Sequence, residues 1–78
     1  MSAEMSGVDR ETRLKELAEQ LGVDWLDYYV YAMGDGPWVA RFEVIKIKGE
    51  GESIAQAEYD LIEKLEKYIE ESGLAKDD

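Results

Sequence analysis

The stretch from Ile54 to Glu71 restricts the folds open to this chain more than any other segment, because it is long, amphipathic and bounded by helix signals. Ser53 and Gln56 have the spacing of a capping box at its start, and Gly73 follows its end. At about 100° per residue, its apolar side chains share one wide face: Ile54, Ala57, Leu61, Ile62, Leu65, Tyr68 and Ile69. The sequence therefore predicts a helix over about 54–71 whose apolar face packs on another layer.

A second helix is predicted from about Asp9 to Leu21, because apolar residues recur there at helical spacing. Either Ser6 or Asp9 suits the N-cap position. Gly22 suits the left-handed position that follows a helix, and Val23 is placed to fold back on the last turn. The stripe that this helix buries consists of Leu14, Leu17, Ala18 and Leu21.

Residues 25–33, with the sequence WLDYYVYAM, are rich in aromatic and β-branched side chains and are predicted to form a strand. Residues 34–37 form a turn, and a second strand is predicted from Trp38 to Lys48. In that strand the apolar positions change from even to odd, which indicates a β-bulge or a strand covered on both faces. Residues 49–52 are predicted to be the next break, and the turn formers are Gly34, Gly36, Gly49 and Gly51.

These elements predict an α+β domain of the order α-β-β-α, with a short third strand as the alternative. We expect both helices to pack on one face of a small antiparallel sheet. The 78 residues allow one domain, which we place at residues 6–73, with a disordered N-terminus at 1–5 and a disordered acidic tail at 74–78. On a pleated first strand, one face carries Tyr29, Tyr31 and Met33 and the other carries Tyr28, Val30 and Ala32.

The charge of the chain excludes several classes of function. Nineteen acidic residues face nine basic ones, so the net charge is −10, yet 45% hydrophobic content is that of a folded protein. Such a surface repels nucleic-acid phosphates and attracts basic proteins. The chain contains no cysteine, so no thiolate is available, and no histidine, which removes the commonest general base and the commonest zinc ligand. We expect a cytoplasmic, non-enzymatic protein without cofactor, metal site or membrane segment.

Four short motifs place the chain near a known family. They are LKELAEQLG at 14–22, the aromatic strand, GPW before the strand that contains Phe42, and GEGES before the long helix. Together, over residues 14–69, they resemble the double-stranded-RNA-binding domain. The resemblance implies an α-β-β-β-α fold with three RNA-binding regions: the first helix, a loop after the first strand, and lysines at the start of the second helix.

The positions that would contact RNA depart from that family's pattern. Glu16 stands at the first-helix contact, Trp38 replaces the loop histidine, and the lysine positions hold Ile54, Ala55 and Glu58. The segment from Phe42 to Ser53 is also shorter than the family usually has, so one strand is expected to be missing or reduced. The resemblance therefore implies the scaffold, but without the cations on which RNA affinity depends.

An acidic ridge on the last helix is the most informative pattern for function. Glu63, Glu66 and Glu70 recur at one-turn spacing opposite the apolar face, which separates their carboxylates by about 5–6 Å. One interpretation is a solvated helix face on which the pairs Asp60–Lys64 and Glu63–Lys67 reduce the repulsion between carboxylates. The other is a surface that imitates nucleic-acid phosphates, because residues 49–78 hold ten acidic residues and three lysines, a net charge of −7.

We therefore predict an inhibitor that occupies the basic nucleic-acid-binding surface of another protein. In size and charge the chain is similar to small acidic phage and mobile-element inhibitors of restriction and CRISPR systems. Its expected partner contacts are Glu63, Glu66, Glu70, Asp60, Glu71, Tyr59 and Trp38. The alternative is a dimerising domain that uses an exposed strand edge or the aromatic residues that the core leaves uncovered, taken from Trp25, Tyr28, Tyr29, Tyr31 and Trp38.

Overall fold

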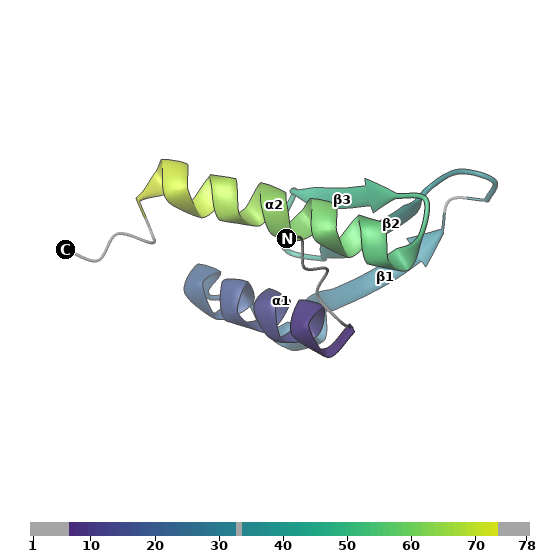
Figure 1. Ribbon diagram of the computed structural model, residues 1–78. Helices are drawn as coiled ribbons and strands as arrows, with labels where there is room; N and C mark the ends of the chain where they lie inside the picture. The colour runs from purple at the N-terminus through teal and green to yellow at the C-terminus, as the bar shows by residue number, and fades with distance from the viewer. Residues whose placement is uncertain (1–6, 33, 74–78) are drawn as a thin grey trace, which may run out of the picture.

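The computed structural model describes residues 7–32 and 34–73. Its elements follow the order α1 (Gly7–Leu21), η1 (Trp25–Asp27), β1 (Tyr28–Ala32), β2 (Trp38–Phe42), β3 (Lys48–Gly51) and α2 (Ile54–Ser72) (Figure 1). The strands form one antiparallel sheet in the order β1-β2-β3, and both helices contact it. The predicted α+β class is confirmed, and the short third strand is present. The segments expected to be disordered, 1–5 and 74–78, lie outside the described residues.

Helix α1 ends as its sequence predicts. Gly22 has a φ of 74°, and its amide donates to the Glu19 carbonyl at 3.1 Å. The amide of Val23 donates to the Ala18 carbonyl at 2.8 Å, which completes a Schellman motif. The start differs from the prediction: α1 begins at Gly7, so Asp9 lies within the first turn and is not the N-cap. Ser6, the other candidate, lies outside the described residues.

The predicted caps of α2 are confirmed. The Ser53 hydroxyl accepts the Gln56 amide at 3.1 Å, and the Gln56 side chain accepts the amide of Glu52 at 3.0 Å, one residue before the cap. Gly73 closes the helix with a φ of 82°. The predicted apolar face is too wide, because Ile54 and Tyr68 are 43% and 47% exposed.

The first strand is shorter than predicted. Asp24 accepts the amide of Leu26 with its side chain and starts the 3-10 turn η1, so pairing begins only at Tyr28. The register then runs from Tyr28 opposite Phe42 to Ala32 opposite Trp38. Met33, the last residue of the predicted strand, lies outside the described residues.

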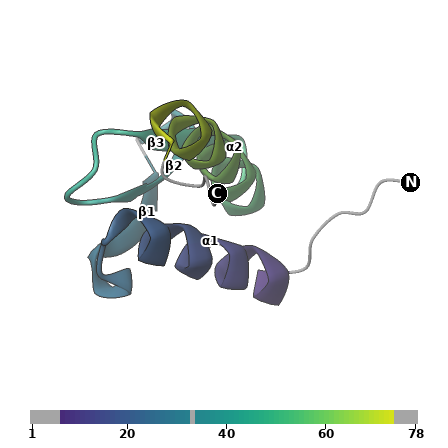
Figure 2. The ribbon, with the colours of Figure 1, turned by 90° about the vertical axis from the view of Figure 1, so that its left-hand side faces the viewer.

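The single strand predicted from Trp38 to Lys48 is wrong. Pairing stops at Phe42 and resumes at Lys48, and the loop between them is held by hydrogen bonds from Ile45 N to Phe42 O and from Arg41 Nη2 to Ile45 O, at 3.1 and 3.0 Å. The change of phase in the apolar pattern therefore marks a loop between two strands, not a bulge. Figure 2 shows this loop projecting to one side of the molecule.

Gly49 and Gly51 are not turn formers, because both lie in β3 with ordinary backbone angles. A Cβ on Gly49 would lie 2.3 Å from the carbonyl oxygen of Ala57, and one on Gly51 would lie 2.5 Å from Cβ of Gln56. The backbone of α2 thus rests directly on β3. Glycine is required here for close approach, not for a turn.

The core lies between the helices and one face of the sheet. Phe42 and Ala40 supply its sheet side, and Tyr28, Val30 and Trp38 pack at its margin. Residues that alternate with these along the strands lie on the other face, which no helix covers. The buried cluster consists of Leu14, Leu17, Ala18, Ala40, Phe42, Ala57, Leu61, Ile62, Leu65 and Ile69.

Candidate protein-binding surfaces

The acid row, defined as Glu63, Glu66 and Glu70, lies exposed along α2. Glu66 accepts from Arg13 of α1 at 2.8 Å, and Arg13 also contacts Glu16 at 3.1 Å. Burial lowers the pKa of Arg13, but its hydrogen bonds to Glu66 and Glu16 outweigh burial and raise the pKa above its usual value. Arg13 therefore joins the helices and offsets part of the negative charge of the row.

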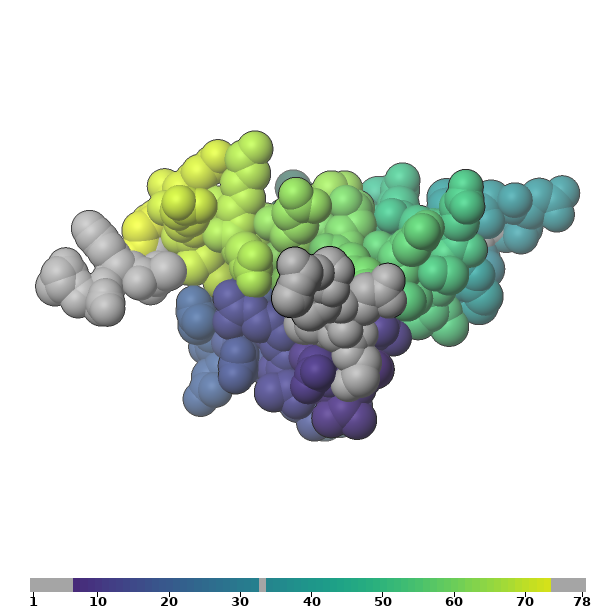
Figure 3. All heavy atoms as spheres, in the orientation of Figure 1, coloured from purple at the N-terminus to yellow at the C-terminus, as the bar shows by residue number. Residues whose placement is uncertain are grey.

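Glu63 and Glu70 differ from Glu66 in their surroundings. Neither makes an ion pair with any residue that the structure describes, so the expected pair Glu63–Lys67 does not form. The space-filling view shows α2 and α1 adjoining on one face of the molecule (Figure 3). The acid row consequently borders the junction of the two helices, where Arg13 lies beside Glu66.

Asp60, another expected contact, binds groups within the protein and has a structural role. Its carboxylate accepts the backbone amide of Glu50 at 3.0 Å and contacts Lys64 at 2.9 Å. Lys64 in turn donates to the carbonyl of Lys48 at 3.2 Å. Burial raises the pKa of Asp60, but these two donors outweigh it and hold the pKa below its usual value. The predicted pair Asp60–Lys64 is present, and it caps the outer edge of β3.

Of the three other expected contacts, Tyr59 continues the acid row, because it lies one helical turn before Glu63 on the same face of α2, whereas Glu71 and Trp38 lie elsewhere. Glu71 lies beside Lys64 and Lys67 on the β3 side of α2. Tyr59 is half-buried and has the guanidinium of Arg10 5.4 Å from its ring centre. Trp38 is half-buried against the core, opposite Gly51 of β3.

A partly buried polar network, which sequence reasoning missed, joins three elements through Glu58. Its carboxylate accepts Arg10 of α1 at 2.8 Å and the Tyr28 hydroxyl of β1 at 2.6 Å. The side chains of Arg10 and Glu58 are only 16% and 15% exposed. The signal was available, because Glu58 lies inside the apolar stripe of α2, between Ala57 and Leu61, where a charge requires a partner.

The uncovered face of the sheet carries an aromatic pair. Tyr29 and Tyr31 stack with ring centres 5.6 Å apart, and Tyr29 is exposed. Val39, which pairs with Tyr31, is nevertheless buried on this face. Trp25 and Tyr28 pack with the core instead, so the expectation that the aromatic residues divide between core and exposed face agrees with their positions.

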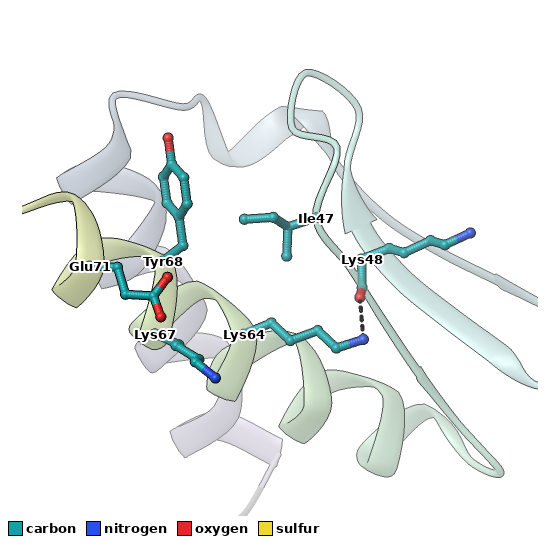
Figure 4. Close-up of a pocket in the computed structure, with 6 residues that line it drawn as sticks. All are labelled: Ile47, Lys48, Lys64, Lys67, Tyr68 and Glu71. Atoms are coloured by element: carbon teal, nitrogen blue, oxygen red, sulfur yellow. Dashed lines mark hydrogen bonds between the residues drawn. The ribbon is translucent and has the colours of Figure 1, made fainter.

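A lysine-bordered groove is a second feature that the sequence did not reveal. It consists of two adjoining hollows of about 440 and 370 Å³ that share Ile47 and Tyr68. In Figure 4 the side chains of Ile47 and Tyr68 point toward the same space, and Lys64 reaches across to the backbone of Lys48. The lining is Leu21, Val23, Val44, Ile45, Lys46, Ile47, Lys48, Lys64, Lys67, Tyr68 and Glu71.

Within residues 7–32 and 34–73, no three acidic side chains gather in a way that could hold a metal ion. No helix among the described residues is long and apolar enough to cross a bilayer. The chain matches no protein-family model, no curated protein and no solved structure. Its element order is the one that the double-stranded-RNA-binding domain would have, but that kinship stays a prediction.

Proposed function

We propose that this protein is a non-enzymatic inhibitor that binds the basic nucleic-acid-binding surface of another protein through the acid row of α2. Glu63, Glu66 and Glu70 provide negative charge at one-turn intervals of about 5–6 Å. A helix holds these charges in order before binding, which lowers the entropic cost of association. Asp60 is not part of the proposed contact, because its carboxylate already binds the edge of β3.

The observation that carries the proposal is the exposure of this row on an ordered helix. Glu63 and Glu70 have no ion-pair partner among the described residues, although Lys67 lies close along the same helix. Three of the six lysines of the chain, Lys46, Lys48 and Lys64, line the groove and do not pair with the row. The three carboxylates of the row outnumber the two cations beside them, Arg13 and Lys67, and this excess of negative charge favours encounter with a cationic surface.

The test is affinity capture from a lysate with two charge-matched variants. One carries Glu63→Lys, Glu66→Lys and Glu70→Lys, and the other carries Glu19→Lys, Glu43→Lys and Glu52→Lys at exposed sites elsewhere. We expect the wild-type protein and the second variant to retain a nucleic-acid-binding protein that duplex DNA and high salt release. Equal capture by both variants would remove the acid row from the mechanism.

A second experiment tests whether the protein itself binds nucleic acid. The purified protein is mixed with DNA and RNA duplexes at physiological ionic strength and examined by gel shift. We expect no shift, because the chain lacks the surplus of cations that duplex binding requires. A shift by the protein alone would contradict the proposal.

Dimerisation through β1 is the second candidate function. The edge of β3 is capped by Asp60 and Lys64, whereas β1 lies at the opposite edge of the sheet. The amide of Tyr28 donates to Trp25 and so points away from β2, and the alternation of an antiparallel ladder directs the amide of Ala32 the same way. This edge can therefore accept a strand from a second copy.

Sedimentation equilibrium distinguishes this candidate from the first. A dimer would show a mass that rises with protein concentration and persists in high salt, since its strand pairing does not depend on opposite charges. Ala32→Pro would abolish the dimer by removing an edge donor, while Ala32→Thr would retain it. A monomeric mass at every concentration would exclude the candidate.

A further inference from the structure

We propose that the lysine-bordered groove is a second binding site, which takes an acidic amphipathic peptide segment of a partner protein. Apolar side chains of the peptide would fill the floor of the groove, and its carboxylates would meet Lys46 and Lys67. This site differs from the acid row in the sign of its charge and in its apolar floor, although Lys67 at its border lies one turn from Glu63 and Glu70. It extends the proposed function without depending on it.

The floor of the groove is apolar surface that folding leaves uncovered. Val44 is 64% exposed, and Tyr68 exposes nearly half of its surface although it belongs to the apolar stripe of α2. Leu21 and Val23 at the end of α1 continue this floor into the core. An apolar peptide side chain placed here would gain the burial that the chain itself does not supply.

The lysines at the border of the groove indicate that its ligand is negatively charged. Lys46, Lys48, Lys64 and Lys67 line it, against the single carboxylate of Glu71. This concentration stands out in a chain whose net charge is −10. Lys64 is held by Asp60, and Lys48 lies 3.7 Å from Glu50. Lys46 and Lys67 make no ion pair with the described residues, so their ammonium groups are available to a ligand.

The shape of the groove favours a peptide over a compact anion. Its two hollows meet at Ile47 and Tyr68, and they extend from the loop between β2 and β3 along the last turns of α2. An elongated ligand with apolar residues and flanking carboxylates would match both hollows. A phosphate or a simple carboxylate would leave the apolar floor uncovered.

The test uses a fluorescent helical peptide with leucine and phenylalanine on one face and glutamate beside them. Fluorescence anisotropy gives its affinity, and amide chemical-shift mapping by NMR gives its location. We expect saturable binding with shifts at residues 44–48 and around Tyr68. A peptide with lysine in place of glutamate, and one with serine in place of the apolar residues, should each bind at least about tenfold more weakly.

Two matched pairs of variants separate the site from nonspecific attraction. Val44→Ser should weaken binding about fivefold, whereas Val8→Ser, at a residue 72% exposed on α1, should have no effect. Lys67→Glu should weaken binding about threefold more than Lys15→Glu, which changes the net charge equally. The variant Glu63→Lys, Glu66→Lys, Glu70→Lys should still bind the peptide, with chemical-shift changes in the groove. If the acid row proves to have no role in inhibition, the peptide-binding result would therefore still stand. Absence of saturable binding, shifts confined to other surfaces, or equal effects within either pair would overturn the proposal.

Discussion

The Tyr28 hydroxyl donates a hydrogen bond of 2.6 Å to the Glu58 carboxylate, which also accepts Arg10 at 2.8 Å. Burial raises the pKa of this hydroxyl well above its usual range, and the bond to Glu58 raises it further, so the hydroxyl stays protonated and donates. One carboxylate thereby connects β1, α1 and α2. The cost of burying its charge is offset only while both donors are in place.

Removing the Tyr28 hydroxyl should therefore destabilise the protein. We expect Tyr28→Phe to lower the free energy of unfolding by about 1 kcal/mol, because a partly buried carboxylate loses one of its donors. A double-mutant cycle with Glu58→Gln, measured by urea denaturation, should give a coupling of about 1 kcal/mol. Tyr29→Phe, on the uncovered face, is the control and should change stability by less than about 0.5 kcal/mol. Strictly additive effects in the cycle would argue against a coupled network.

Contact between α2 and β3 depends on Gly49. A methyl group there would lie 2.3 Å from backbone atoms of both Ala57 and Leu61, and a backbone cannot yield as a flexible side chain would. We expect Gly49→Ala to cost about 3 kcal/mol or more, enough to unfold much of so small a domain. Circular dichroism during urea denaturation would measure the loss. Gly7→Ala, whose nearest contact is 3.7 Å away, is the control and should be neutral or slightly stabilising.

The cap on the edge of β3 should make stability sensitive to acid. The pKa of Asp60 is lowered in the folded protein, so its contribution is complete above the unfolded pKa of about 3.9 and is lost as the pH falls through the lower folded value. We expect Asp60→Asn to cost about 1 kcal/mol at neutral pH and to lose less stability than the wild type on further acidification. Urea denaturation at several pH values would measure both effects. Asp35→Asn, in the exposed turn, is the control and should change stability at neutral pH by less than about 0.5 kcal/mol.

The parts of this fold that follow local rules were predictable from sequence. The end of α1 at Gly22, the cap at Ser53 and the apolar stripe around Leu61 each depend on residues within one or two turns. The division of residues 38–51 into two strands was not predictable in this way. Gly49 and Gly51 have turn chemistry in isolation, and only the approach of α2 gives them their place in a strand.

The candidate surfaces were also predictable only where they depend on residues close together in the sequence. The spacing of Glu63, Glu66 and Glu70 predicted one exposed row on α2, but no local rule indicated that Arg13, distant in sequence, would bind Glu66. The roles of Asp60 and Glu58 likewise depend on groups from β3, α1 and β1. The lysine-bordered groove combines the end of α1, the loop before β3 and α2, so no single stretch of sequence indicates it.

Arg13 provides the sharpest test of the acid row, because it is the cation that offsets the charge of Glu66 and Glu16. Arg13→Gln should raise affinity for a cationic probe, an immobilised oligolysine peptide, by about two- to fivefold, since two carboxylates lose their internal partner. Lys15→Gln changes the net charge equally on another side of α1 and should raise affinity less. The measurement is surface plasmon resonance at low and physiological salt, where the gain in affinity should shrink as ions screen the row.

The loss of the bond between the helices should lower stability by about 1 kcal/mol, so binding is compared below the unfolding transition of each variant. An equal gain from Lys15→Gln would show that net charge alone, and not the arrangement of the row, attracts the cationic partner.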